Sequence, residues 1–226
     1  MTDPTPSAID RLMGQLIVSV QADDGSPLRD TVIIVALCRA VLAGGAGGLR
    51  LRSPEDIAAV RPLTALPIIG LTKAQHPGCE AFITATAAEV RSVVRAGADI
   101  VAVDATALSR PEPLEDLIRA AHDAGALLMA DISTFAEAEH AYAHGADIVG
   151  TTMSGYTPHS SQQELPDFAL MEALHAKGLP FIAEGRLKTT QDAVRAQKTG
   201  ACAVVVGSAI TRPDHVTRWF SEALSG

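Results

Sequence analysis

The chain has 226 residues, 47 % of them hydrophobic, and a formal net charge of −8 at pH 7. This length suits one α/β barrel or two small domains, and we expect a single domain over residues 1–226. The negative charge argues against a nucleic-acid or anionic-membrane partner, while leaving room for a local cationic pocket around a small phosphate.

The cysteines and the first residues bear on cellular location. Three cysteines are scattered at positions 38, 79 and 202 without a C-x-x-C pair, so neither a disulfide framework nor a zinc site is indicated. Residues 1–13 contain early aspartates and two prolines rather than an apolar run, which argues against a secretory signal. We therefore expect a reducing, cytoplasmic compartment, with residues 1–13 forming an N-terminal extension or a helix.

The next stretch, Val32–Leu49, is apolar enough to resemble a membrane span. Arg39 interrupts it, however, and four glycines crowd its end. These features favour a core helix followed by a turn.

Later in the chain one pattern recurs, in which a glycine follows a helix-like stretch and precedes an apolar run. Examples lie at Gly97, Gly125, Gly145, Gly178 and Gly200. A glycine just after a helix accepts the left-handed conformation that ends the helix, and a short turn then leads into a strand. The repeat is typical of successive βα units.

Short, continuous apolar runs are the predicted strands, as expected when both faces of a parallel strand are covered. They are Leu16–Val20, Gly48–Leu51, Pro67–Leu71, Ile100–Val103, Leu127–Ala130, Ile148–Gly150, Phe181–Ala183 and Ala203–Val206. The amphipathic stretches between them are Pro54–Val60, Ala88–Ala96, Leu114–Ala124, Phe135–His144, Asp167–Lys177 and Thr190–Thr199. Several open with a capping signal, as at Ser53 and Thr134, with an acidic residue in the first turn.

Eight evenly distributed strands predict an α/β fold of one domain, a (β/α)8 TIM barrel. The competing open, doubly wound sheet is disfavoured because no G-x-G-x-x-G follows the first strand. Active sites of such barrels form where the strands end. The polar residues at these positions are Gln21, Arg50, Lys73, Asp104, Asp131, Thr151-Thr152, Glu184-Gly185-Arg186 and Gly207-Ser208.

The last two of these corners predict a phosphate site. Gly185 and Gly207-Ser208 would let backbone N–H groups approach an anion, and the loops after strands seven and eight are the usual place for phosphate in a barrel. The alternative is that these glycines only turn the chain. Arg186 adds a guanidinium to the corner.

Lys73 and Glu184 are the candidate catalytic pair. Lys73 ends an apolar strand that would place its ammonium in the barrel mouth, where burial and cations such as Arg50 or Arg212 would lower its pKa. Glu184 could hold that ammonium or act as a second acid or base. The alternatives are a surface lysine and a purely structural ion pair.

Three further features leave alternatives open. Asp131 either caps the next helix or binds a sugar hydroxyl at the barrel mouth. His140 and His144 have i, i+4 spacing but lack a following glutamate, so we expect no metal site. The long polar segment Ser154–Leu165 is a candidate mobile lid over bound substrate.

Taken together, these residues resemble the N-acylglucosamine-6-phosphate 2-epimerase family over about Gly14 to Leu224. The most specific motifs are Thr151-Thr-Met-Ser-Gly-Tyr-Thr157 and Ala183-Glu-Gly-Arg186. The others are Leu16-Ile-Val-Ser-Val-Gln21, Pro67-Ile-Ile-Gly-Leu-Thr-Lys73, Ala98-Asp-Ile-Val-Ala-Val-Asp104, Asp131-Ile-Ser-Thr134 and Val206-Gly-Ser-Ala-Ile-Thr-Arg212. Val20, Arg52 and Ala74 depart from the residues usual in the family.

The resemblance implies interconversion of N-acetylmannosamine 6-phosphate and N-acetylglucosamine 6-phosphate in sialic acid or N-acetylmannosamine catabolism, on a phosphate-binding TIM barrel. It implies catalytic roles for Lys73 and Glu184. It also implies substrate contacts and phosphate contacts. The substrate contacts are Gln21, Arg50, Asp131 and Arg212, and the phosphate contacts are Gly185, Arg186, Gly207 and Ser208.

The chemistry agrees with this reaction. Only the open-chain aldehyde makes the C2 proton acidic enough to remove, so Lys73 would act as a neutral amine while Gln21 or Arg50 stabilises the enolate oxygen. No redox change occurs, so we expect neither a cofactor nor a metal. The alternatives are another phosphosugar isomerase, a lyase in which Lys73 forms a Schiff base, or a phosphosugar-binding module without turnover. A C-terminal helix over Val216–Leu224 would either pair two copies into a homodimer or pack on the barrel.

Overall fold

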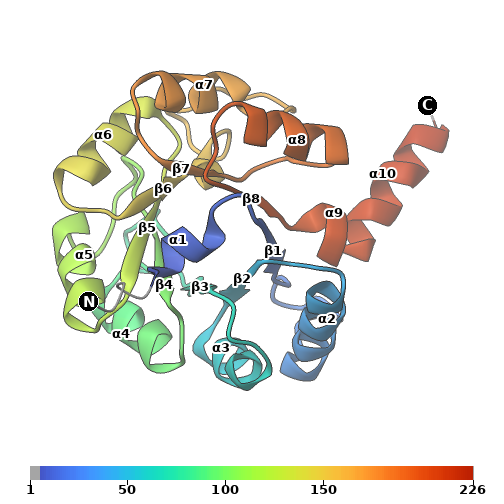
Figure 1. Ribbon diagram of the computed structural model, residues 1–226, viewed down its shortest axis with the longest axis horizontal. Helices are drawn as coiled ribbons and strands as arrows, with labels where there is room; N and C mark the ends of the chain where they lie inside the picture. The colour runs from blue at the N-terminus through green and yellow to red at the C-terminus, as the bar shows by residue number, and fades with distance from the viewer. Residues whose placement is uncertain (1–5, 226) are drawn as a thin grey trace.

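The computed structural model describes residues 6–225, which form a closed barrel of eight parallel strands (Figure 1). The strands are β1 (Leu16–Val20), β2 (Gly48–Arg52), β3 (Ile68–Leu71), β4 (Ile100–Asp104), β5 (Leu127–Asp131), β6 (Ile148–Gly150), β7 (Phe181–Ala183) and β8 (Ala203–Val206). Each strand pairs with the next, and β8 pairs with β1 in the register Val18 to Val206. The predicted (β/α)8 barrel is confirmed.

The observed strand bounds differ from the predicted ones by at most one residue at either end. Strands β2, β4 and β5 each include the polar residue that follows the apolar run, namely Arg52, Asp104 and Asp131. Strand β3 begins at Ile68 because Pro67 has no N–H to donate to the ladder, although its carbonyl accepts from Leu49. The polar residues at the carboxyl ends are therefore held by the barrel itself.

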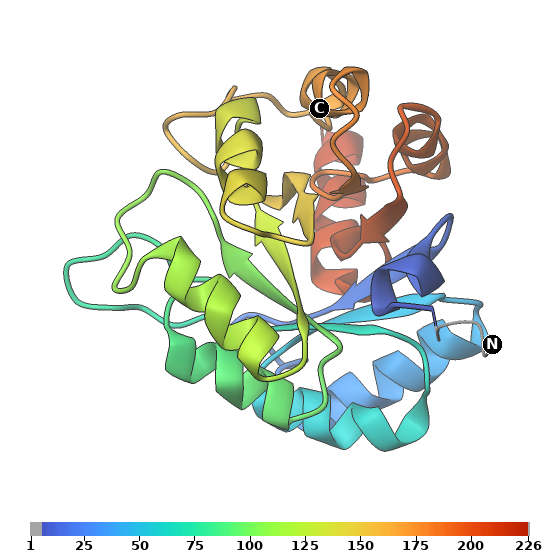
Figure 2. The same ribbon diagram turned by 60° about the vertical axis from the view of Figure 1, so that its left-hand side comes forward.

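Helices cover the outside of the barrel, as Figure 2 shows. They are α1 (Ala8–Leu12), α2 (Thr31–Ala43), α3 (Pro54–Val60), α4 (Ala87–Arg95), α5 (Leu114–Asp123), α6 (Phe135–Ala143), α7 (Phe168–Ala176), α8 (Thr190–Lys198), α9 (Ser208–Thr211) and α10 (Pro213–Ser225), with 3-10 turns at Arg61–Leu63 and Thr151–Met153. The apolar stretch Val32–Leu49 is α2, a turn and the start of β2, as predicted. The capping signals are also confirmed: Ser53 and Thr134 each accept from the backbone N–H three residues on.

Helix α1 closes the amino-terminal mouth of the barrel and lies across its middle in Figure 1. Leu12 is 1 % exposed and belongs to the interior apolar cluster with Ile17, Ile69 and Ile100. Of the two alternatives for residues 1–13, an extension or a helix, the structure has a helix over Ala8–Leu12, while residues 1–5 lie outside the described range. With apolar side chains at this end, polar chemistry is confined to the carboxyl ends of the strands.

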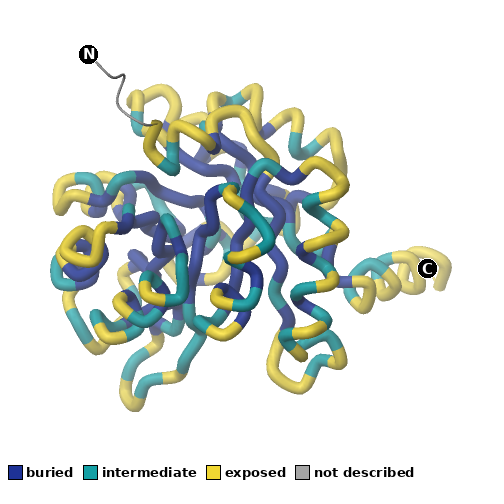
Figure 3. Tube along the Cα trace, turned by 60° about the horizontal axis from the view of Figure 1, so that its bottom comes forward, coloured by how far each residue is buried: buried dark blue, intermediate teal, exposed yellow. Residues whose placement is uncertain are grey.

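Helix α10 differs from the other long helices because none of its described residues is buried. It projects from the barrel near the C-terminus in Figures 1 and 3. Phe220 is 68 % exposed and Leu224 is 88 % exposed. Over residues 6–225, no helix combines the length and the apolar composition that a membrane span requires.

Candidate active site

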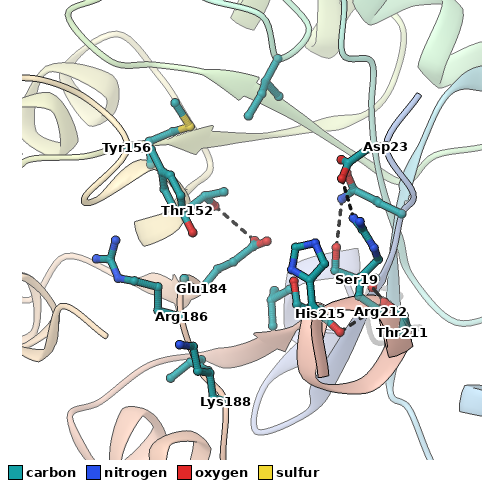
Figure 4. A pocket seen from close by; sticks show the side chains of 18 of the residues that line it. Ser19, Asp23, Thr152, Tyr156, Glu184, Arg186, Lys188, Thr211, Arg212 and His215 are labelled. Carbon is teal, nitrogen blue, oxygen red and sulfur yellow. Dashed lines mark hydrogen bonds and ion pairs between the residues drawn. The ribbon is translucent and has the colours of Figure 1, made fainter. Parts of the chain in front are cut away.

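A cavity of about 540 Å³ opens at the carboxyl ends of the strands, and Figure 4 shows its lining. Most of the predicted site residues line this cavity. They are Gln21, Lys73, Glu184, Gly185, Arg186, Gly207, Ser208 and Arg212. The remaining two, Arg50 and Asp131, do not line the cavity but lie buried beside it, in contact with Glu184 or its partners.

A buried ion-pair network forms the floor of this site. Arg50 binds Asp131 through two bonds, with Nη1 3.1 Å from Oδ1 and Nη2 2.6 Å from Oδ2. Its Nη1 is also 2.9 Å from Oε2 of Glu184. Thr152 lies between the two carboxylates, since its hydroxyl is 2.7 Å from Asp131 Oδ1 and 3.2 Å from Glu184 Oε2. Arg50 of β2 and Asp131 of β5 are thus joined to Thr152, in the turn after β6, and to Glu184, which directly follows β7.

This network bears on one of the two alternatives for Asp131, the helix cap. The carboxylate is fully buried and both of its oxygens accept from Arg50. The helix that follows is capped by Thr134 and Glu137 instead. The helix-cap alternative for Asp131 is therefore wrong, because a partner on β2 occupies the carboxylate.

The network also sets protonation states. Burial disfavours the charged guanidinium of Arg50, but Asp131 and Glu184 outweigh this effect and raise its pKa, so Arg50 stays charged. Burial raises the pKa of Glu184, the Arg50 charge opposes the rise, and the Asp131 charge adds to it. Within the described chain, Oε1 of Glu184 accepts no hydrogen bond, so one carboxylate oxygen is uncommitted.

Lys73 lies two residues beyond β3, where a single antiparallel bridge to Ile83 holds its backbone. Burial lowers the pKa of its ammonium, and the charges of Arg50 and Arg52 lower it further. Among residues 6–225 no hydrogen bond or ion pair engages its Nζ. The predicted ion pair with Glu184 is therefore not formed, because Arg50 takes that place.

Of the two cations predicted to lower the pKa of Lys73, Arg50 is confirmed, whereas Arg212 is not among the main influences. Its guanidinium pairs with Asp23 at 2.8 Å and with Asp214 at 2.8 Å, which balances its charge. The hydrogen bond to Asp214 is the main reason that the pKa of Arg212 is raised, while the same contact holds the pKa of Asp214 at about 2. Arg52, which the sequence marked only as a departure from the family pattern, acts on Lys73 instead.

Gln21 has an amide oxygen that is buried and without a hydrogen-bond partner. Its amide nitrogen donates to the hydroxyl of Ser19 at 2.9 Å. Gln21 therefore has an unused acceptor beside the cavity rather than a free donor that would stabilise an enolate oxygen. An acceptor at this place suits a hydroxyl or amide N–H of a substrate.

The corner after β7 has an unusual backbone. Gly185 has φ +111° and Arg186 has φ +57°, a left-handed conformation that costs a residue with a Cβ about 1 kcal/mol or more. The N–H groups of Gly185, Arg186 and Ser208 find no acceptor among the described residues. Free N–H groups that face a cavity favour an anion there.

The Arg186 side chain lies opposite Arg212 and Asp23 in the view of Figure 4. Its Nε donates to the carbonyl of Leu165 at 3.0 Å, and the guanidinium carbon lies 5.5 Å from the ring centroid of Tyr156. Both contacts belong to the segment Ser154–Leu165. That segment is held by internal bonds, including Gly155 N–H to the Ser160 hydroxyl at 2.8 Å, and its role as a mobile lid stays a prediction.

Several lining residues were absent from the sequence-based set. Lys188 lies two residues after Arg186, with its Nζ 4.9 Å from the Trp219 ring centroid. His215 and Trp219 reach the cavity from α10, and Asp23 follows Gln21. The basic residues after β7 were a signal for Lys188. Nothing in the sequence indicates that the first turns of α10 reach the cavity. Within residues 6–225, no cluster of three metal-ligating side chains lies in this cavity.

The chain is similar to known proteins in both sequence and fold. The family model described as "Putative N-acetylmannosamine-6-phosphate epimerase" matches residues 34–226. A solved N-acetylmannosamine-6-phosphate 2-epimerase from Clostridium perfringens is 38 % identical with a TM-score of 0.95, and the alignment covers 99 % of each chain.

Curated relatives agree in sequence but differ in length. A Clostridioides difficile protein named as an N-acetylmannosamine-6-phosphate 2-epimerase is 42 % identical over 220 residues, covering 96 % of this chain and 98 % of that protein. The Brucella melitensis "Bifunctional enzyme NanE/NanK" is 46 % identical over 216 residues, covering 96 % of this chain but 42 % of the relative. The chain thus spans about two fifths of that bifunctional relative. On this coverage, the chain belongs to the NanE family of N-acetylmannosamine-6-phosphate epimerases.

Proposed function

We propose that the protein interconverts N-acetylmannosamine 6-phosphate and N-acetylglucosamine 6-phosphate by inverting C2, within catabolism of sialic acid or N-acetylmannosamine. One observation carries the proposal: a lysine with a lowered pKa and an unpaired Nζ shares a cavity with an anion-binding corner. The lysine supplies a base and the corner supplies an anchor for phosphate. The identity of the sugar is inferred from the family to which the chain belongs.

The reaction begins from the open-chain sugar, whose C1 aldehyde acidifies the proton on C2. Neutral Lys73 takes this proton, the C2–H electron pair moves into the C1–C2 bond, and negative charge develops on the aldehyde oxygen. Return of a proton to the opposite face of C2 gives the epimer and restores the aldehyde. Glu184, with a raised pKa and one free oxygen, is suited to deliver or relay that proton.

Arg50 and Asp131 contribute by positioning. Both are buried outside the cavity lining, and Arg50 has only its Nε without a partner. We assign them the task of fixing Glu184 Oε2 so that Oε1 faces the sugar. Gln21 accepts a hydrogen bond from a substrate hydroxyl or amide N–H. Arg212 is already paired with Asp23 and Asp214, so we assign it a hydrogen bond to an uncharged part of the sugar rather than to the phosphate.

The phosphate lies at the corner made by Gly185, Arg186, Gly207 and Ser208. Gly207 packs closely on Ser19, since a Cβ at this position would lie 3.2 Å from the Ser19 Cβ. A side chain at Gly207 would therefore require Ser19 to shift by a few tenths of an ångström. Lys188 adds a second cation to the same side.

Replacing the proposed base tests the assignment directly. Lys73→Ala should lose at least about a hundredfold in kcat, because general base catalysis is typically worth 10² to 10⁴-fold. The measurement is solvent deuterium incorporation at C2 of either hexosamine phosphate. Near-normal exchange in a folded Lys73→Ala variant would discard the mechanism, and a borohydride-trapped adduct on Lys73 in the wild type would favour a Schiff-base lyase.

The pH profile tests the electrostatics. A lowered pKa means that neutral Lys73 appears, and kcat/KM rises, at a lower pH than for an ordinary lysine. Arg52→Gln removes a positive neighbour, so the pKa of Lys73 and the rising limb of kcat/KM should move to higher pH. Arg39→Gln, on the exposed side of α2, is the matched control. If the rising limb of the kcat/KM profile lies at the same pH in Arg52→Gln as in the wild type, the Arg52 charge does not lower the pKa of Lys73.

The phosphate corner predicts a selective loss. Arg186→Ala should raise KM for the phosphorylated sugars about ten- to a hundredfold, because a charge-assisted contact is worth about 1.5–3 kcal/mol. Any residual turnover of the unphosphorylated sugar should change little. Arg195→Ala, outside the cavity, controls for loss of a surface arginine. Equal losses for both sugars would contradict the assignment.

We also propose a homodimer that works in the cytoplasm. The unpaired state of Cys38, Cys79 and Cys202 suits a reducing compartment. The dimer proposal rests on α10, whose apolar residues Phe220 and Leu224 are left exposed by its own barrel, so a second copy would cover them.

The association is testable by light scattering coupled to size exclusion. Phe220→Glu should convert a dimer into a monomer, because a carboxylate buried at an apolar contact lacks a partner. Arg218→Glu, an exposed change on the same helix, should leave the mass unchanged. A wild-type monomer, or equal masses for wild type and Phe220→Glu, would exclude this interface.

A further inference from the structure

A second cluster of reactive side chains lies on the outside of the barrel, between α5 and α6. Glu115, His140 and His144 each present one ligand atom, and these atoms all lie within 4.8 Å of one another. The two imidazole ring centroids are 4.1 Å apart. The proposed reaction does not use these residues.

The ring of His144 is oriented for coordination. Its Nδ1 lies 2.7 Å from the carbonyl oxygen of His140, and because a carbonyl can only accept, Nδ1 must carry a proton. In the neutral ring Nε2 then holds the lone pair. A histidine that ligates a metal usually donates its other ring nitrogen to such an acceptor, so the supporting contact is already present.

The lone pair of Nε2 points at a carboxylate. Nε2 of His144 is 3.1 Å from Oε1 of Glu115, and neither atom has a proton to share when the ring is neutral. Two ligand atoms about 2.0 Å from one tetrahedral ion lie about 3.3 Å apart. The observed separation therefore fits two ligands of one cation, while the ordinary alternative is a protonated His144 paired with Glu115.

There is room for an ion and a fourth ligand. A cavity of about 570 Å³ lies against this cluster, with Glu115, His140 and His159 among its lining residues. Arg110 also lines it, but its guanidinium donates to the carbonyls of Asp104 and Thr106. A water molecule can therefore complete a tetrahedron from the cavity side.

We propose that Glu115, His140 and His144 bind one divalent transition ion of the zinc class at the α5–α6 surface. Two imidazole nitrogens and one carboxylate oxygen suit Zn²⁺, Co²⁺ or Ni²⁺, whereas Mg²⁺ and Ca²⁺ prefer all-oxygen sites. The ion would link α5 to α6 and stabilise the barrel wall without touching the active cavity.

Cobalt titration of the full-length protein tests the proposal. Co²⁺ should give the visible absorption of a tetrahedral ion with a 1:1 end point, and excess Zn²⁺ should abolish it. At a hundredfold excess of Zn²⁺ over Kd, Tm should rise by roughly 5–10 °C, and Mg²⁺ should leave it unchanged.

Variants separate this site from chance binding. His140→Ala and His144→Ala should each remove the cobalt spectrum and the Tm shift while keeping epimerase activity. His122→Ala, which removes an exposed histidine of α5 paired with Asp147, should keep both signals. A spectrum that survives in His140→Ala and His144→Ala, or that shows sulfur-to-cobalt charge transfer from a cysteine, would overturn the proposal. So would the absence of binding to the wild type.

Discussion

One buried guanidinium determines much of the active site. Arg50 lies on β2 and is bound by Asp131 of β5 and by Glu184, which directly follows β7, so it links the ends of three strands at the barrel mouth. A buried ion needs partners, and removing one partner from such a network costs about 3–5 kcal/mol because the other charge is left uncompensated. The same contacts hold Glu184 in one orientation, so stability and catalytic geometry depend on a single side chain.

The charges of this network do not cancel. One guanidinium faces two carboxylates, and the remaining negative charge favours a proton on Glu184 or an ammonium on Lys73 nearby. Burial acts on these two groups in opposite directions, because it raises the pKa of a carboxyl and lowers the pKa of an amine. Their pKa values therefore approach each other. A lysine with a lowered pKa beside a glutamate with a raised pKa is suited to removing and returning a proton at one carbon.

Sequence reasoning predicted the fold well because each barrel unit is a local pattern: an apolar run, a capped helix and a glycine. It also placed Lys73 and Glu184 correctly in one cavity, since residues after parallel strands meet at the same mouth. The sequence did not, however, reveal which charged side chains form ion pairs with one another. Glu184 binds Arg50 rather than Lys73, and Arg212 pairs with Asp23, because side-chain direction depends on strand register and tilt that no local pattern encodes. The proximity of Glu115 to His140 and His144 was hidden because the sequence does not show which faces of α5 and α6 meet.

In the corner after β7, the proposed catalytic residue Glu184 is followed directly by the proposed phosphate-binding residues Gly185 and Arg186. Glu184 belongs to the ion-pair network, and the next two residues line the cavity, have positive φ and find no acceptor for their N–H groups among the described residues. A phosphate bound there would be held a fixed number of bonds from the carboxylate, with little freedom between them. The strain at Arg186 persists because the Leu165 carbonyl and the Tyr156 ring hold its side chain on the far wall. In the proposed mechanism, binding energy gained at the phosphate would hold C2 between Lys73 and Glu184, where proximity would lower the barrier to proton transfer.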